Sequence, residues 1–279
     1  MLYLVYELRA EHPTMGSRDM YHLLKPGFIG RDAFESFFKR YGLSSAKPVN
    51  YRRTTDSSGV VRFGNLTTTL ELNKMNQLWV SDITYYDLHG KFYYLTFIMD
   101  AFTRRILGHS TSERLFTEQT TLPALLMAAK VRKGMSLQGT VLHSDGGGQY
   151  YDADFLKETK RLGLANSMCE YPWENGKAER INGVIKNNYL RHRSIKNYSE
   201  LVKEVDRAVA LYNEYKPHIA LNRVSPVTYE EMYLRDGKTS EGEKSTTECE
   251  TRSPREMNSP LGCGKKSSGS NITQEYASN

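Results

Sequence analysis

The spacing of hydrophobic residues divides the chain into segments of different predicted structure. Residues 78–86, 92–99 and 105–112 are runs of mainly β-branched, aromatic and other apolar residues, and short polar turns separate them. Such runs are typical of strands, and their close succession predicts three consecutive antiparallel strands. Two shorter apolar runs, at 140–142 and 164–167, predict two further strands.

Helices are predicted between and after these strands. Within residues 117–132, Leu122, Leu125, Leu126 and Ala129 fall on one helical face, as in a helix packed on a core. The same kind of pattern predicts helices over 152–162, 175–190 and 198–215. Three strands followed by alternating helices and strands predict an α/β core, with a mixed five-stranded sheet flanked by helices on both faces.

The N-terminal residues 1–46 are predicted to form a small helical module. Three short helices are expected at 1–10, 17–24 and 30–41, with Pro and Gly residues between them and Ser17 as an N-cap. Two short helices joined by a Gly-containing turn favour a helix-turn-helix, whose second helix enters the major groove of DNA. A helical cap packed on the core is the alternative.

The chain is therefore expected to have four regions. They are a helix-turn-helix-like DNA-binding module at 1–46, a linker at 47–75, the core at 76–235 and a disordered C-terminal tail at 236–279. The tail is predicted to be disordered because Ser, Thr, Glu, Lys and Gly dominate it and no hydrophobic period survives.

The charge of the chain indicates a polyanionic partner. The net charge is +6, and residues 1–75 hold 11 Lys and Arg against 7 Asp and Glu. A basic end on a nearly neutral body favours DNA, although ordinary solubility charge is the alternative. The candidate DNA contacts in this part of the chain are Arg31, Lys39, Arg40, Arg52 and Arg53.

Cysteine content and hydropathy bound the cellular setting. The chain has 3 cysteines, and their spacing matches neither a metal site nor a disulfide framework. No apolar run approaches the roughly 20 residues that a membrane span needs. We therefore expect a cytoplasmic protein without a membrane partner.

Two aspartates lie at notable positions in the predicted strands, one in the middle of a strand and one at a strand tip. Asp82 lies inside the apolar run 78–86, where Asp is rare, and a buried Asp needs a partner such as a metal ion. Asp145 follows the strand at 140–142 and precedes three glycines. Ordinary turn chemistry is the alternative for Asp145.

A third acid is predicted on a helix. Glu179, Asn182 and Lys186 share one face, although a solvated polar face would give the same pattern. Two strand-borne aspartates and a helix-borne glutamate form an oxygen ligand set suited to Mg²⁺ or Mn²⁺. Two such ions about 4 Å apart can activate an attacking oxygen and stabilise a leaving oxygen in phosphoryl transfer.

Six motifs in a fixed order resemble one protein family. They cover roughly residues 1–235 and are Trp79-x-x-Asp82-Ile83-Thr84-Tyr85, His143-Ser144-Asp145-x-Gly147-x-Gln149-Tyr150, Ser167-Met168, Asn175-x-x-x-Glu179-x-x-x-Gly183-x-x-Lys186, Tyr212-Asn213-x-x-Lys216-Pro217-His218-x-x-Leu221 and Ser225-Pro226. The set resembles the catalytic subunit (OrfB type) of insertion-sequence transposases with a retroviral-integrase-like DDE core.

The resemblance implies an RNase H-like fold and a DDE-type polynucleotidyl transferase. Asp82, Asp145 and Glu179 would be its catalytic, metal-binding triad, with Mg²⁺ or Mn²⁺, two ions in all, as cofactor. The implied activity is metal-dependent DNA 3′-end cleavage and strand transfer, which integrate an insertion sequence. The implied partners are DNA at the element ends and target, further copies of the chain, and a transposase subunit from an upstream reading frame.

Two features of the chain depart from the family pattern. The loop Cys169–Asn175 is about two residues shorter than usual, and Glu174-Asn175-Gly176 replaces Asp-Asn-Ala. With the unmatched tail, these departures keep two alternatives open, which are a catalytically decayed DNA-binding protein and a metal-dependent nuclease of the same fold.

A second group of basic residues follows Glu179. The segment Lys186–Lys196 contains no acid and is a candidate contact for the DNA backbone, with a solvated helix end as the alternative. Its basic residues are Lys186, Arg191, Arg193 and Lys196.

Overall fold

The computed structural model describes residues 1–44 and 63–245, except for the side chains of residue 172 and residues 237–245. Arg52, Arg53, most of the expected linker and the tail beyond residue 245 lie outside this part of the chain. Residues Met1–Asp236 form one compact unit. Among the described residues, no helix is long and apolar enough to cross a membrane.

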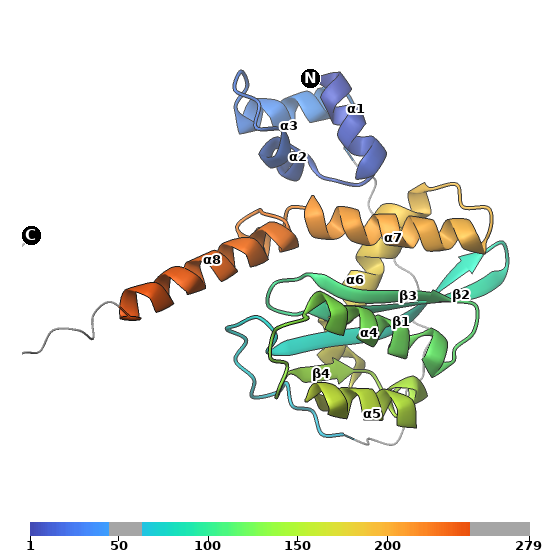
Figure 1. The fold of residues 1–279 in the computed structure, drawn as a ribbon. Helices are drawn as coiled ribbons and strands as arrows, with labels where there is room; N and C mark the ends of the chain where they lie inside the picture. Colours follow the sequence, from blue (N-terminus) through green and yellow to red (C-terminus); the bar gives the residue numbers. More distant parts are fainter. Residues whose placement is uncertain (45–62, 246–279) are drawn as a thin grey trace, which may run out of the picture. The chain divides into compact units, whose positions relative to one another are not determined.

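The centre of the fold is the predicted five-stranded mixed sheet (Figure 1). Its strands are β1 (Leu78–Leu88), β2 (Lys91–Asp100), β3 (Ile106–Ser112), β4 (Val141–Ser144) and β5 (Ala165–Met168), in the order β3-β2-β1-β4-β5. The first three are antiparallel neighbours, while β4 is parallel to β1 and β5 is parallel to β4. This arrangement confirms the predicted RNase H-like sheet.

The alternation of side chains along β1 divides the core into two layers. Leu78 and Val80 face α6 (Gly176–Val184) and α7 (Tyr198–Glu214), whereas Trp79 faces the opposite side. On that side it packs with residues of α4 (Thr121–Val131) and α5 (Ala153–Leu162). Helices therefore cover both faces of the sheet, as predicted (Figure 1).

Helix α4 approaches β3 closely because Gly108 has no side chain. A Cβ at Gly108 would lie 2.0 Å from the carbonyl oxygen of Ala124 and 2.8 Å from the amide nitrogen of Ala128. Both atoms belong to the helix backbone, so a side chain here would push the helix off the sheet.

Two predicted helices are interrupted in the structure. The segment expected at 117–132 begins with a 3₁₀ turn, Thr117–Gln119, and α4 starts only after Thr120, whose backbone leaves the helical region. The segment expected at 175–190 continues from α6 into a π-helical turn, Ile185–Tyr189, and a 3₁₀ turn, Leu190–His192. The irregular turns bring the neighbouring Tyr189 and Leu190 both into the core.

The N-terminal module has the three predicted helices, α1 (Leu2–Glu11), α2 (Ser17–Leu24) and α3 (Arg31–Arg40). The prediction of Ser17 as N-cap is wrong by one position, because Ser17 is already helical and the extended Gly16 precedes it. The module has its own small core, which contains Val5, Met15, Met20, Phe34 and Phe38.

The module also contacts the rest of the compact unit. Glu11 pairs with Arg207 of α7, and Asp19 lies 3.2 Å from Arg223. A hydrogen bond of 3.2 Å joins His12 Nδ1 and the Tyr189 hydroxyl. The DNA-binding role of the module stays a prediction beside these contacts.

The last helix was not predicted from the sequence. Helix α8 (Pro226–Ser245) begins where the Ser225 hydroxyl accepts the amide hydrogen of Thr228. The helix continues to Ser245, so the expected boundary at residue 236 falls inside it. The assignment of 236–279 to a disordered tail can be compared with the structure only as far as residue 245.

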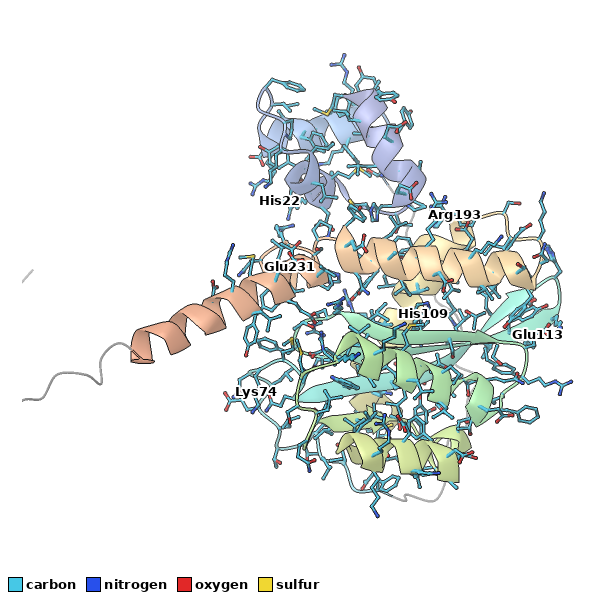
Figure 2. All side chains as sticks on the ribbon, viewed as in Figure 1. His22, Lys74, His109, Glu113, Arg193 and Glu231 are labelled. Atoms are coloured by element: carbon cyan, nitrogen blue, oxygen red, sulfur yellow. The ribbon has the colours of Figure 1, made fainter. Side chains whose placement is uncertain are left out.

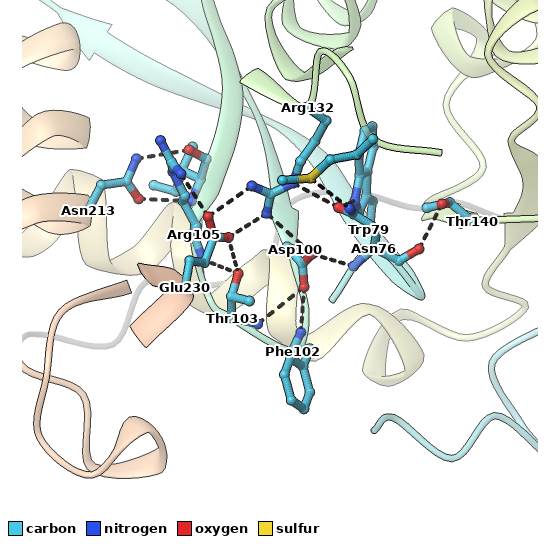
Figure 3. Close-up of polar contacts among 12 residues, drawn as sticks. Asn76, Trp79, Asp100, Phe102, Thr103, Arg105, Arg132, Thr140, Asn213 and Glu230 are labelled. Atoms are coloured by element: carbon cyan, nitrogen blue, oxygen red, sulfur yellow. Dashed lines mark hydrogen bonds and ion pairs between the residues drawn. The ribbon is translucent and has the colours of Figure 1, made fainter. Parts of the chain in front are cut away.

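A buried ion network attaches α8 to the sheet (Figure 3). Glu230 accepts two hydrogen bonds from the Arg132 guanidinium and a third from the Thr103 hydroxyl. Arg105 pairs with the same carboxylate at 2.7 Å, and Asp100 lies 3.5 Å from Arg132. Burial of these charges is tolerated because each one has partners of opposite charge.

Candidate catalytic site

Strand pairing sets the positions of the two aspartates. Strands β1 and β4 are parallel, and their last paired residues are Val80 and His143. Asp82 and Asp145 each lie two residues beyond this pair, and residues two apart in a strand point to the same side. Asp82 therefore lies within β1, just past the part that pairs with β4, and Asp145 lies just past the carboxyl end of β4. Both are on the face of the sheet that α6 covers.

The Asp82 carboxylate has a defined orientation. Its Oδ2 accepts a hydrogen bond of 2.8 Å from Asn182 Nδ2 on α6. Asn175 lies just before α6, and its Nδ2 donates to the carbonyl oxygen of Ser81 at 2.9 Å. Two buried asparagines thus hold the start of α6 against the middle of β1.

Asp145 begins a loop that several polar contacts order. The amide of Gly147 donates to Asp145 Oδ1 at 3.2 Å. The buried Tyr150 hydroxyl lies 2.8 Å from the Ser81 hydroxyl oxygen, and Gln149 Nε2 donates to the carbonyl oxygen of Leu115. The predicted Gly-rich loop is therefore tied to both β1 and the segment before α4.

Glu179, Asn182 and Lys186 line one groove, as their helical spacing predicts. We call it the catalytic groove. It has a volume of about 440 Å³ and also contains Asp82, Thr84, Tyr85, Tyr86, Asp87, Gly183, Asn187 and Arg191. Lys186 Nζ donates to Thr84 Oγ1 at 2.6 Å and to the Tyr85 carbonyl oxygen at 3.3 Å.

The three acids are near one another but do not converge on a single point. Among the described residues, no three His, Cys, Asp or Glu side chains are grouped closely enough to hold a metal ion. Asp145 does not line the catalytic groove, whereas Asp82 and Glu179 do. The structure thus brings all three to one region without forming a closed ligand set.

The electrostatics of this region favour a bound cation. Burial, reinforced by the charges of Asp145 and Glu179, raises the pKa of Asp82 to about 8, against a smaller opposing effect of Lys186. Burial also raises the pKa of Asp145. The Oδ1 of Asn182 is buried and has no hydrogen-bond partner among the described residues. An excess of oxygen donors with unfavourable negative charge fits a hard divalent cation.

The basic residues predicted after Glu179 differ in their surroundings. Lys186 and Arg191 line the catalytic groove. The side chain of Arg193, which is labelled in Figure 2, is occupied within the protein. It lies 3.6 Å from Glu204 of α7 and donates to the Glu11 carbonyl oxygen. Lys196 is exposed.

The basic residues predicted in the N-terminal module are on its surface. Arg31 is exposed and pairs with its neighbour Asp32 at 3.0 Å. Lys39 and Arg40 are exposed in the last turn of α3.

Sequence reasoning assigned no role to Asn175 or Ser81 in building the site, and for Tyr150 it expected an ordering of the loop or of DNA without naming a partner. Asn175 and Tyr150 belong to motifs that the sequence analysis identified, so the motifs themselves carried the signal. What the motifs could not give was the partner, because Ser81 receives contacts from residues 69 and 94 positions away.

The mixed sheet and the acids on β1, after β4 and on α6 are the features of a protein with an integrase-type core. Residues 73–171 match the family model described as Integrase core domain, and residues 162–226 match a second model with the same description.

Relatives extend the likeness over most of the chain. A protein of Shigella sonnei, "Insertion element IS600 uncharacterized 31 kDa protein", is 30% identical over 82% of this chain and 88% of its own length. "Transposase for insertion sequence element IS629", also of Shigella sonnei, is 30% identical over 80% of this chain and 75% of its own. A solved structure of the HTLV-2 integrase catalytic core domain in complex with magnesium covers 55% of this chain and 95% of its own, with 18% identity and a TM-score of 0.44.

The chain belongs to the insertion-sequence transposases with an integrase core domain. It is a polynucleotidyl transferase type of enzyme that acts on DNA in transposition.

Proposed function

We propose that Asp82, Asp145 and Glu179 hold divalent metal ions, Mg²⁺ or Mn²⁺ and two in number, and that this site carries out DNA 3′-end cleavage and strand transfer. The observation that supports the proposal most is the register of β1 and β4. It places both aspartates two residues beyond a paired position, on the face that carries Glu179.

Metal ions at such a site supply charge stabilisation for the attacking and leaving oxygens of a phosphoryl transfer. The protein itself supplies position. Asn182 orients the Asp82 carboxylate, and Asn175 fixes the backbone before Asp82. Lys186 lies in the same groove, where its ammonium group can bind a phosphate oxygen of the DNA.

The remaining candidate contacts belong to the same proposal. Arg191 and Lys196 would bind the DNA backbone beside the groove, and Arg31, Lys39 and Arg40 would bind it from the N-terminal module. A transposase holds two DNA ends, so we infer a homo-oligomer on DNA. A subunit from an upstream reading frame would complete the assembly.

The test is a cleavage and strand-transfer assay with labelled duplexes that carry the ends of the element encoding the chain. The variants Asp82→Asn, Asp145→Asn and Glu179→Gln remove one carboxylate charge each. We expect each to lower both activities by at least about a hundredfold, the scale of losing one group that stabilises the transition state. Glu170→Gln is the matched control, because Glu170 is an exposed carboxylate outside the groove.

Full activity of Glu179→Gln would show the assignment to be wrong. Cleavage without a joined product would favour a nuclease of the same fold. DNA binding without metal dependence or cleavage would favour a decayed DNA-binding protein, which the shortened loop before Glu179 also suggests.

A further inference from the structure

A second cavity lies against the opposite side of α6 from the catalytic groove. It has a volume of about 590 Å³. The α6 residues that line it are Lys177, Arg180, Ile181 and Val184, whereas Glu179, Asn182 and Gly183 line the catalytic groove. One helix therefore separates the two cavities, with a different set of side chains facing each.

Four cations gather around this second cavity, which we call the basic cavity. They come from three separate segments: Arg104 follows β2, Lys177 and Arg180 belong to α6, and Lys216 follows α7. Within the described part of the chain none of the four forms an ion pair. The carboxylate that lines the cavity is Asp19, and Arg223 already pairs with it at 3.2 Å.

Two groups in the motif around Lys216 have surroundings that an anion in the cavity would stabilise. Lys216 is largely buried, and its pKa is lowered by burial and by Arg180, against the attraction of Asp19. His218 also lines the cavity, and its Nε2 is buried without a hydrogen-bond partner among the described residues. Burial and the neighbouring cations Lys216, Arg104 and Arg180 lower the pKa of His218 to about 3, so its ring is neutral.

The residues that line the basic cavity include part of the motif Tyr212–Leu221, which the proposed catalytic site does not use. Asn213 of the motif exchanges two hydrogen bonds of 2.9 Å with the backbone of Ile106, which fixes the end of α7 on β3. Lys216 and His218 follow at the wall of the basic cavity. Like charges held together at a partly buried site are unfavourable, and an anion with several oxygens would offset that cost.

We propose that the basic cavity binds a phosphate group of the DNA backbone, while the DNA occupies the catalytic groove on the other side of α6. This inference rests on the proposed function and names a second DNA contact for it. Arg104 and Arg180 present planar guanidinium groups, which suit phosphate oxygens. An α-helix is about 10–12 Å across, and the DNA major groove is about 12 Å wide. If α6 lay in the major groove, the phosphates on the two sides of that groove would therefore fall near the two cavities on the two sides of the helix.

The test is DNA binding by fluorescence anisotropy in metal-free buffer, as a function of salt concentration. Cleavage and the metal ligands do not enter this measurement. We compare the whole chain with Arg180→Gln and with Arg180→Gln/Lys216→Gln. The matched control is Lys157→Gln/Lys160→Gln, which removes two exposed cations from α5, away from both cavities.

In a plot of the logarithm of the DNA-binding constant against the logarithm of salt concentration, loss of one phosphate contact should make the slope shallower by about 0.9. If the variant and the parent bind equally at 1 M salt, the variant then binds about eightfold more weakly than the parent at 0.1 M salt. We expect this loss for the double variant and a smaller one for Arg180→Gln. Arg180→Lys keeps the positive charge but not the planar guanidinium, so it should retain the salt slope of the parent with a smaller loss of affinity than Arg180→Gln. The control pair should leave slope and affinity unchanged. Removal of the unpaired Lys216 should also raise Tm, which separates lost binding from lost folding.

Equal slopes for the parent and the double variant would overturn the inference and leave the proposed catalytic site intact. A double variant that binds DNA normally but no longer self-associates would assign the cavity to an acidic segment of another subunit, and this also overturns it. Inorganic phosphate could protect the parent against unfolding while the parent and the double variant bind DNA equally. That result would assign the basic cavity to free phosphate alone and would also overturn the inference. Absence of DNA binding by the parent would contradict both this inference and the proposed function. The catalytic site is tested separately by Asp82→Asn, which should lose cleavage but keep normal DNA binding.

Discussion

The surroundings of Asp82 favour the neutral, protonated form of its carboxyl group. Burial and two neighbouring acids act against ionisation, while Asn182 and Lys186 act for it. A residue placed in this way is costly for a protein that only has to fold, and perturbed acids of this kind are concentrated at functional sites. The sequence revealed the residue through its position in an apolar strand.

Buried histidines should make the stability of the protein depend on acidity. Burial, together with Lys216 and Arg193, lowers the pKa of His12 from its usual 6.5 to about 4. Between these values the unfolded chain binds a proton that the folded chain does not, so His12 stabilises the fold above pH 6.5 and this contribution is lost as the pH falls toward 4. We expect the free energy of unfolding in urea to fall over this range, and less steeply in His12→Asn.

The control for this measurement is His89→Asn. His89 is exposed in the turn between β1 and β2, and its backbone has φ of 55°, a conformation that Asn adopts readily. Its pH profile should run parallel to that of the parent. A His12→Asn profile parallel to both would show that His12 is not buried in the neutral form.

The elements of the core could be predicted because their signals are local. Strands β1 to β3 and helix α5 have apolar patterns that identify them within a residue or two. The start of α8 gave no such signal, because the segment after Pro226 is mostly polar and has little amphipathic character. Its attachment depends on Arg132 and Asp100, which are 98 and 130 positions away from Glu230 in sequence numbering. Contacts over such distances cannot be inferred from one sequence.

The ion network under α8 gives a prediction about two arginines that share one carboxylate. Glu230→Gln should lower the free energy of unfolding by about 3–5 kcal/mol, because it leaves the fully buried Arg132 without its main partner. Arg105→Gln should cost about 1 kcal/mol or less, because Arg105 is 28% exposed and water screens its interaction with Glu230. Urea unfolding monitored by circular dichroism measures both. Similar small losses in the two variants would contradict a buried network that holds α8.

At the scale of the whole molecule, the sequence predicted the class of fold and the residues of the proposed site, and the structure adds how they meet. The order of motifs gave the three acids, but the register of β1 and β4 depends on tertiary packing. The basic cavity could not be predicted from the sequence for the same reason. Its four cations come from segments that the fold alone brings together.

The most direct test of the central claim is calorimetric titration of the protein with Mn²⁺ or Mg²⁺, with and without duplex DNA. Asp82→Asn/Asp145→Asn serves as the comparison. We predict binding by the parent, and a loss of that binding in the double variant, because two of the three proposed ligands have become neutral. Equal binding in both proteins would place the metal elsewhere. Absence of binding by the parent, even with DNA present, would contradict a metal-dependent site at Asp82, Asp145 and Glu179.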